Sequence, residues 1–364
     1  MDAPKAGALN HWDAGETLAD RFRVHVGNAE HLYGYAVRGM AQDWETGGPV
    51  RMACSGYENA PRGSAIHLRL LAGVFRLVLT GRAEEPVAFY PCLGGSALAS
   101  QAWPVIREVI GAHVDEMHAA LAVPPQTNEV GRSAALLAGL FDLVAASGVR
   151  RIRLLEVGAS AGLNLLLDHY AYRGDSWQFG FTDSKIQFVD SIEGPVQPEH
   201  FMITSRAGCD LHPVDATTAD GRLLLTSFVW PFDLDRHQRL SLALAIAAVH
   251  PVRIDRASAI RWLRYALTDE PDGLPVSGTQ SPRCIGRAMK SPPLRASCRA
   301  TAHSTDSARS ALSSTHTVRG ARSPSCVLGY GTRAPAVRFV NAGLAPHTTT
   351  ASPSHSQPVD ERFS

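Results

Sequence analysis

Apolar residues recur at helical spacing through the first third of the chain. In residues 64–79 they return every third or fourth position, with glycines just before and just after the segment, which predicts one amphipathic helix. Similar stripes predict helices within residues 17–44 and 101–121. We therefore expect residues 1–123 to form a helical domain whose apolar stripes make its core.

The pattern changes in the middle of the chain. Residues 154–157 form a short apolar run typical of a buried strand, residues 158–162 predict a tight turn, and residues 163–167 restart an apolar run that predicts a helix. Such a unit aims free backbone N–H groups and the positive helix end at one point. We therefore expect a ligand there, and the nearby carboxylate of Glu156 favours an amine or hydroxyl over a phosphate.

A polar segment precedes this unit. Residues 124–132 begin with two prolines and open a helix for which Thr127 or Asn128 suits the N-cap position. In a doubly wound sheet this helix would begin at the edge where the strands end, which is where such sheets bind ligands. The polar residues that this places near the turn, either as site residues or as plain surface, are Gln126, Asn128, Glu129 and Arg132.

Further strands are predicted beyond the central turn. Residues 170–184 suggest a loop, and the alternating residues 185–190 predict a second strand that ends in an acid, Asp190. In folds of this kind an acid at the end of the second strand accepts the ribose hydroxyls of a cofactor, so Asp190 is our candidate and Asp183 the alternative. Residues 200–205 are a possible third strand.

The last periodic segment completes an α/β pattern. Residues 222–230 predict a strand that ends at Trp230, a side chain that either stacks on a ligand or belongs to the core. Helices are predicted at residues 235–249 and 255–267. We therefore expect a Rossmann-like, doubly wound sheet over residues 124–275, next to the helical domain.

Beyond Val276 the periodicity vanishes. Residues 276–364 are rich in Ser, Thr, Pro, Arg and Ala, and contain eleven Lys and Arg against three Asp and Glu. The charges are scattered, and aromatic residues that could stack on bases, such as Tyr330 and Phe339, are few and not interleaved with the charges, which argues against a nucleic-acid partner. We expect a disordered tail and a sheet without its C-terminal strands, with residues 222–230 left as an exposed edge.

The cysteines and the overall composition exclude several classes of protein. The six cysteines contain no C-x-x-C pair, and although Cys209 and His212 have a spacing that a metal could use, nothing completes the set, so no metal site is predicted. The chain has no apolar N-terminal segment and no apolar run of 18 residues. We expect a cytoplasmic protein with reduced thiols and without a membrane partner.

The central turn resembles the first motif of S-adenosylmethionine-dependent methyltransferases, in which an acidic residue is followed by small residues at alternate positions. Ser160 replaces the middle glycine of that motif. By this resemblance the residues that bind S-adenosylmethionine would be Glu156, Gly158, Ser160, Gly162, Asn164 and Asp190. The candidate substrate-binding residues are Gln126, Asn128, Arg132 and Trp230. The candidate catalytic bases are Glu129, His212 and Asp215, and the substrate would be an unknown small molecule or macromolecule.

Residues 21–267 are identified as a member of a bacterial family of unknown function with a methyltransferase-like Rossmann domain. The segments that carry this resemblance are residues 124–132, 154–165, 208–215 and 229–231. In relatives the chain continues after Val276 with a further strand and a His-Ser motif. The switch in composition here is what a frame shift in GC-rich coding DNA would produce, so we expect residues from about 277 onward to be out of frame and this chain to be impaired.

Two other interpretations of the central turn stay open. One is an enzyme that uses a nucleotide or dinucleotide on the same fold, which Ser160 and Glu156 disfavour. The other is a non-catalytic ligand-binding or interaction protein, which would keep a pocket and show no turnover.

Overall fold

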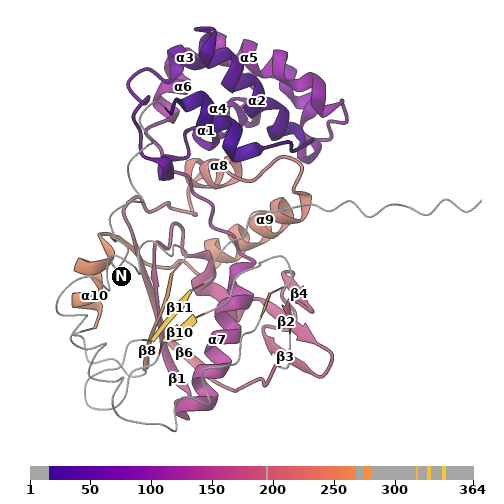
Figure 1. Ribbon diagram of the computed structural model, residues 1–364. Helices are drawn as coiled ribbons and strands as arrows, with labels where there is room; N and C mark the ends of the chain where they lie inside the picture. The colour runs from indigo at the N-terminus through magenta and orange to yellow at the C-terminus, as the bar shows by residue number, and fades with distance from the viewer. Residues whose placement is uncertain are drawn as a thin grey trace, which may run out of the picture.

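A layer of helices lies above a mainly parallel sheet in this mixed α/β protein (Figure 1). The computed structural model describes residues 16–193, 196–267 and 274–279, and short strands at 317–318, 326–328 and 338–341. The helices α8 and α9 lie between the upper layer and the sheet, so they connect the two parts of the molecule (Figure 1). Within the described residues, no helix has the length and apolarity needed to cross a bilayer.

The upper layer contains the predicted helices, in shorter pieces. Its helices are α1 (Leu18–Val26), α2 (Leu32–Glu45), α3 (Pro49–Ala53), α4 (Ile66–Leu79), α5 (Ala102–Ala112) and α6 (Val114–Ala120), with 3-10 turns η1 (Arg62–Ser64), η2 (Glu85–Phe89), η3 (Pro91–Leu93) and η4 (Ala99–Gln101). The single helix expected within residues 17–44 is broken at Gly27, whose φ of 51° ends α1. The helix expected within residues 101–121 is also broken. His113, whose φ of −130° and ψ of 37° are not helical, separates α5 from α6.

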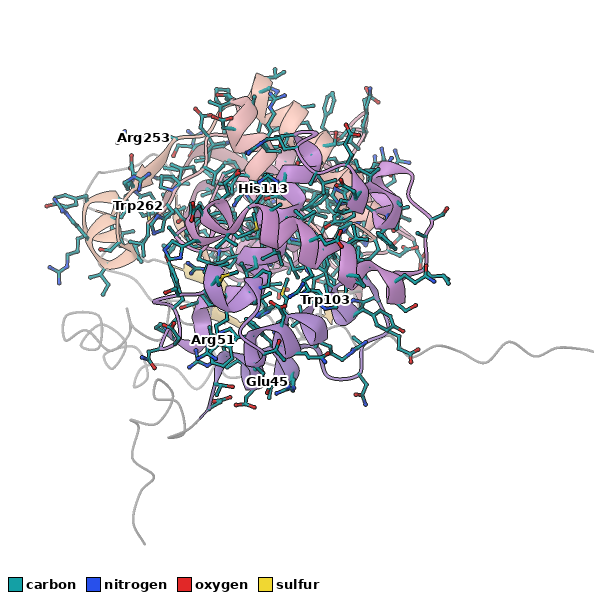
Figure 2. All side chains as sticks on the ribbon, turned by 90° about the horizontal axis from the view of Figure 1, so that it is seen from above. Glu45, Arg51, Trp103, His113, Arg253 and Trp262 are labelled. Atoms are coloured by element: carbon teal, nitrogen blue, oxygen red, sulfur yellow. The ribbon has the colours of Figure 1, made fainter. Side chains whose placement is uncertain are left out.

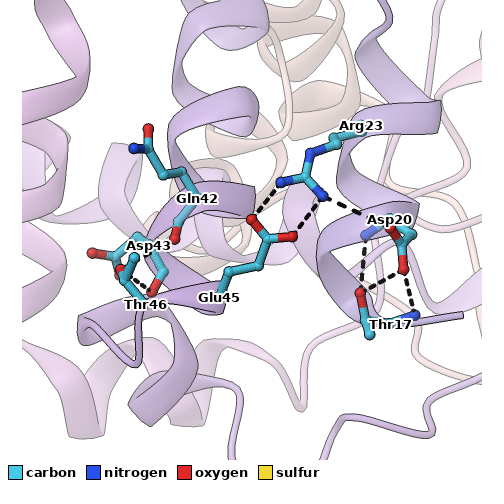
Figure 3. Close-up of polar contacts among 7 residues, drawn as sticks. All are labelled: Thr17, Asp20, Arg23, Gln42, Asp43, Glu45 and Thr46. Atoms are coloured by element: carbon cyan, nitrogen blue, oxygen red, sulfur yellow. Dashed lines mark hydrogen bonds and ion pairs between the residues drawn. The ribbon is translucent and has the colours of Figure 1, made fainter. Parts of the chain in front are cut away.

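Polar contacts fix the first two helices to each other (Figure 3). Thr17 and Asp20 form a capping box at the start of α1, with a 3.2 Å bond from the Asp20 N–H to the threonine hydroxyl. Arg23 at the end of α1 pairs with Glu45 at the end of α2, with 2.8 Å between Nη1 and Oε1. Because this pair is about half exposed and water screens its charges, it adds little stability, and buried side chains do most to hold the layer together.

The lower layer is a six-stranded sheet around β1. Its strands are β1 (Arg151–Val157), β6 (Met202–Asp210), β7 (Ile254–Arg256), β8 (Leu274–Thr279), β10 (Cys326–Leu328) and β11 (Arg338–Asn341). The order is β10-β11-β8-β1-β6-β7, and all neighbours are parallel except the pair β10 and β11. The chain moves outward from β1 to β6 and β7, then returns to β8 on the other side of β1. The strand order thus reverses at β1, and in doubly wound sheets ligands bind beyond the carboxyl ends of the strands at such a point.

Helices cover the faces of this sheet, and their bounds explain two differences from the sequence analysis. They are α7 (Arg132–Ser147), η5 (Leu163–His169), α8 (Ala219–Ser227), α9 (Leu234–Val249) and α10 (Ala259–Ala266). The strand predicted at residues 222–230 is wrong, because Thr218 caps a helix there by accepting a bond from the Gly221 N–H. A short apolar run does not distinguish a buried strand from a buried helix. The segment after Gly162 is a 3-10 helix and not an α-helix.

Residues 170–184, expected to be a loop, contain a hairpin. Its strands β2 (Ala171–Gly174) and β3 (Trp177–Gly180) form a separate small sheet with β4 (Gln187–Val189), in the order β3-β2-β4. Phe179 packs edge-to-face on Phe141 of α7 at 5.3 Å, which attaches the hairpin to the main core. The predicted second strand therefore exists as β4, but it pairs with β2 and not with β1.

The region after Val276 also differs from the expectation of missing C-terminal strands. β8 continues to Thr279 and pairs with β1, and β11 pairs with β8, so β1 is covered on both sides. A further strand, β9 (Thr317–Val318), pairs with β5 (Ile192–Glu193). The remainder of the predicted tail lies outside the described residues.

A small satellite core lies at one margin of the sheet. Seen from above, Arg253 and Trp262 lie near each other at the edge of the molecule (Figure 2). Asp255 in β7 accepts a 2.8 Å bond from each of them, at the Arg253 Nε and the Trp262 Nε1. These bonds fix α10 over the end of β7, where Trp262 and Leu263 are buried against Leu155 of β1.

Two histidine rings contact each other inside the helical layer. His25 of α1 and His67 of α4 have ring centroids 3.8 Å apart, and His67 is 7% exposed. Burial, with the nearby His25, lowers the pKa of His67 to about 3 and burial also lowers that of His25. Both rings are therefore neutral in the folded protein at neutral pH, whereas the unfolded chain protonates them near pH 6.5.

We expect the free energy of unfolding to fall as the pH drops from about 6.5 toward 3, because the unfolded state then binds protons that buried His67 does not. The slope from this residue is about 1.4 kcal/mol per pH unit. Urea denaturation at several pH values should show a shallower slope for His67→Phe than for the wild type. Exposed His200→Gln is the matched control and should keep the wild-type slope; equal slopes in all three proteins would contradict the assignment.

Candidate functional site

The turn after β1 is strained in the way its sequence requires. Gly158, Ser160 and Gly162 all have positive φ, at 72°, 53° and 71°. A Cβ at position 162 would lie 2.8 Å from the Cδ1 atom at the movable end of the Ile254 side chain, so the main reason for glycine there is its backbone conformation. Ser160 adopts the left-handed conformation without being glycine, at a cost of about 1–2 kcal/mol. Its surroundings must offset that cost.

Residues at the end of β6 contact the turn around Ser160. The Gly158 and Ala159 N–H groups donate to the Cys209 carbonyl at 2.8 and 3.1 Å, and the Ser160 N–H donates to the Asp210 carboxylate at 2.9 Å. The expectation that the N–H groups of this turn are free for a ligand is therefore wrong for these three. They hold the turn against β6, which removes the usual reason for a phosphate to bind such a turn.

Asp210 occupies the position for which the sequence suggested Asp190. It ends β6, the strand that pairs with β1, and its Oδ1 also accepts a 2.8 Å bond from the His212 N–H. Asp190 is exposed at the end of β4, in the small sheet, and Asp183 is exposed as well. The hairpin inserted between β1 and β6 misled the spacing argument. The signal that could have identified Asp210 was its place within the 208–215 segment.

The segment 124–131 lies against this turn, as its predicted position requires. The Gln126 side chain accepts a bond from the Ser160 hydroxyl at 2.5 Å and donates to the His212 carbonyl at 3.3 Å. Gln126 thus bridges the turn after β1 and the loop after β6. The N-cap of α7 is Gly131 and not Thr127 or Asn128, so the side chain of Asn128 is not used for capping.

Glu129, one of the candidate bases, is engaged in ion pairs. Its Oε2 lies 2.5 Å from the Arg236 Nε and its Oε1 3.5 Å from Arg239, both on α9, and the Gly131 N–H donates to Oε1 at 3.0 Å. Arg236 also donates to the Thr127 carbonyl at 2.6 Å. With 14% of its side chain exposed, Glu129 serves to fix the 124–131 loop on α9.

Polar side chains are buried around the turn. Those in the 124–133 segment and in β1, the turn and η5 are Gln126, Asn128, Ser133, Glu156, Ser160 and Asn164. Asn128 is 3% exposed and Asn164 2% exposed, and neither the Oδ1 nor the Nδ2 atom of either side chain has a hydrogen-bond partner among the described residues. A buried amide left in this state costs about 1–3 kcal/mol, and native proteins rarely retain two of them without a reason.

Opposite charges meet beside these amides. Glu156 is 3% exposed near the end of β1, and Arg132 is the first residue of α7. Burial lowers the pKa of Arg132, while the nearby carboxylates of Glu129 and Glu156 act in the opposite direction. The site therefore combines a buried carboxylate, a guanidinium and amide groups, which suits a ligand carrying both positive and polar groups.

The remaining candidates are placed less favourably for chemistry. Asp215 is exposed, and the Thr217 N–H and hydroxyl donate to its Oδ1 at 2.9 and 2.6 Å, which lowers its pKa and weakens it as a base. His212 is exposed at the margin of the turn. Trp230 packs against His31 and Tyr33, with ring centroids 5.1 and 5.9 Å away, so it is partly buried against the core of the helical layer.

No group of three His, Cys, Asp or Glu side chains suited to a metal ion occurs among the described residues. Cys209 is buried at the end of β6, where its carbonyl accepts hydrogen bonds from the turn.

We expect Glu129→Gln to lower the free energy of unfolding by about 2–4 kcal/mol, because it removes one partner of a largely buried ion pair and leaves Arg236 uncompensated. The amide can still accept the bond from the Gly131 N–H, so the measurement isolates the charge. Chemical denaturation followed by circular dichroism provides the value. Exposed Glu84→Gln is the control, with a change of about 0.5 kcal/mol or less; a Glu129→Gln change no larger than that control's would show that the pair does not fix the loop.

Comparisons with known proteins identify relatives of unknown activity. No curated protein and no solved structure matches the chain. A family described as an uncharacterized protein conserved in bacteria, DUF2332, matches residues 16–279. The match spans the helical layer, the turn with its buried amides, and the sheet as far as β8. The chain therefore belongs to the DUF2332 family of uncharacterized bacterial proteins.

Proposed function

We propose that this protein binds S-adenosylmethionine at the carboxyl ends of β1 and β6 and transfers its methyl group to an acceptor. The observation that carries the proposal is the pair of buried amides, Asn128 and Asn164, whose four polar atoms have no partner among the described residues. Both flank the turn, and both need a ligand with donors and acceptors. A purely apolar ligand would leave these amide groups without hydrogen bonds, and the free-energy cost of burying them would remain.

The charges around the turn fit such a ligand. The carboxylate of Glu156 complements the positive charge of a sulfonium or of an amino-acid amine, and Arg132 complements a carboxylate. Asp210, at the end of the strand next to β1, is placed to accept ribose hydroxyls in exchange for one of its contacts with the turn. The bound N–H groups of Gly158, Ala159 and Ser160 disfavour a phosphate-bearing nucleotide at the same place.

The topology supports the same proposal. The strand order reverses at β1, and in doubly wound sheets ligands bind where the order reverses, beyond the carboxyl ends of the strands. When bound, S-adenosylmethionine would supply a methyl carbon that passes to a nucleophile while its bonding electron pair stays on sulfur. The protein then has to hold donor and acceptor in line and exclude water, for which no strong base is required.

We expect isothermal titration to show binding of S-adenosylmethionine and S-adenosylhomocysteine, and weaker or no binding of ATP and NAD. Glu156→Gln and Asp210→Asn should each weaken binding at least about tenfold, a loss of about 1.4 kcal/mol, because each removes a charge next to the ligand. Asp190→Asn is the matched control and should bind as the wild type does. Loss of affinity in Asp190→Asn but not in Asp210→Asn, or no binding at all, would refute the site.

A second candidate function is ligand binding without turnover. The observation that favours it is the engagement of the carboxylates that could act as bases: Glu129 by Arg236 and Arg239, and Asp215 by Thr217. An acceptor that needs deprotonation would find neither of them available.

Transfer of a radiolabelled methyl group separates these two functions. For a methyltransferase we expect label from S-adenosylmethionine to appear in an acceptor from bacterial extract, and the amount to fall at least about tenfold with Glu156→Gln. The Asp190→Asn protein should label as much as the wild type. Tight binding in the titration with no labelled product above the protein-free blank would assign the chain to the ligand-binding alternative.

A further inference from the structure

A second cavity lies between the helical layer and the helices that cover the sheet. Its volume is about 350 Å³, within the range of sites for small organic molecules. Four elements line it: α4 and η3 from the upper layer, and α8 and α9 from below. The helices α4 and α8 lie next to each other where the two layers join (Figure 1). None of the residues around the turn after β1 lines it, so it is separate from the site described above.

The upper wall of this cavity is mainly apolar. Phe75 and Leu79 are one turn apart on α4, and Leu93 of η3 lies beside them. The Cys92 N–H donates to the Pro231 carbonyl at 2.9 Å, which fixes η3 to the segment before α9. Leu79 and Leu93 therefore offer a fixed aliphatic surface to the body of a ligand, with the buried ring of Phe75 supporting it from behind.

The lower wall is polar and positive. Arg222 and Thr226 are one turn apart on α8, and His237 and Ser241 are one turn apart on α9. The Arg222 Nε donates to the Ala216 carbonyl at 3.0 Å, which holds its guanidinium at the rim. No Asp or Glu is among the residues that line the cavity, so this rim attracts an anion.

His237 provides an acceptor inside the cavity. One ring nitrogen is hydrogen-bonded to the Trp230 backbone, and burial lowers the pKa of the ring, which is therefore neutral at neutral pH. The other, Nε2, is buried and has no hydrogen-bond partner among the described residues. A neutral imidazole that donates through Nδ1 to a carbonyl leaves Nε2 as an acceptor, so a hydroxyl or N–H of a ligand would satisfy it.

We propose that this interlayer cavity binds a small organic acid with an aromatic or aliphatic body, whose anionic group pairs with Arg222 and whose hydroxyl or N–H group donates to His237. Its apolar body would lie against Leu79 and Leu93. A water-filled gap is the competing explanation, and it predicts no selectivity among ligands of this size.

Three related molecules test each part of the proposal by isothermal titration with the full chain. The probes are 4-hydroxyphenylacetate, phenylacetate, which lacks the hydroxyl, and 2-(4-hydroxyphenyl)ethanol, which lacks the charge. We expect 4-hydroxyphenylacetate to bind with one-to-one stoichiometry and more tightly than the other two. No binding of any probe at about 1 mM would overturn the proposal.

Two substitutions assign the groups. Arg222→Gln should weaken 4-hydroxyphenylacetate about tenfold and leave the uncharged alcohol within about twofold of the wild type. His237→Asn keeps a donor near the Trp230 carbonyl and removes Nε2. It should therefore make the affinities for 4-hydroxyphenylacetate and phenylacetate about equal. An Arg222→Gln protein that loses both the acid and the alcohol equally, or a His237→Asn protein that keeps the preference for the hydroxyl, would overturn the proposal.

A third substitution tests the location. Ser241 is exposed at the cavity, and Ser241→Trp should fill it and abolish binding of all three probes, with Arg253→Gln, at the far margin of the sheet, as the control that binds normally (Figure 2). If the Ser241→Trp protein melts at a lower temperature than the wild type, Ser241→Phe is used in its place. Binding that survives in the folded variant would overturn the proposal. S-adenosylmethionine titrated into the same variants keeps its wild-type affinity if the two sites are independent, so failure here leaves the first proposal standing.

Discussion

The contact between the end of β6 and the turn after β1 is the interaction on which the rest of the site depends. Parallel pairing of the two strands brings Cys209 next to Val157, and the Cys209 carbonyl then accepts two N–H groups of the turn. Asp210 adds a third bond, to Ser160, whose backbone would otherwise be the most strained in the turn. This contact fixes the turn before any ligand arrives, and pre-organised groups lose less entropy on binding.

The same contact explains why the buried amides matter. A mobile turn could rotate to let Gln126, Asn128 and Asn164 reach water, but this turn is held on one side by β6 and on the other by the 124–131 loop. Arg236 and Arg239 hold that loop through their ion pairs with Glu129. The polar groups around the turn are therefore enclosed by structure on several sides.

The sequence predicted the parts of this arrangement that are local. The helix α7, the strand β1 and the turn follow each other directly, so periodicity and glycine positions located all three, and the polar segment before α7 was correctly placed against the turn. Pairing between distant segments could not be predicted in this way. The alternation at residues 185–190 indicates a strand but not its partner, so Asp190 was expected at the edge of the main sheet beside β1, a position that Asp210 occupies. The leucines around position 224 fit a buried strand and a buried helix equally well, and only the cap at Thr218 decides for α8.

The helix α9 has two faces that serve different neighbours. Arg236 and Arg239 contact the loop beside the turn, while His237 and Ser241 line the interlayer cavity. These residues alternate within little more than one helical turn, and a helix moves as a stiff rod because its own backbone bonds resist local bending. A tilt or slide of α9 would therefore move its contacts at the turn and at the interlayer cavity together. If a ligand at one of these places biases that movement, thermodynamic reciprocity requires that a ligand at the other place changes its affinity by the same factor. The junction between the layers is thus a place through which binding in one half of the protein can change ligand affinity in the other half.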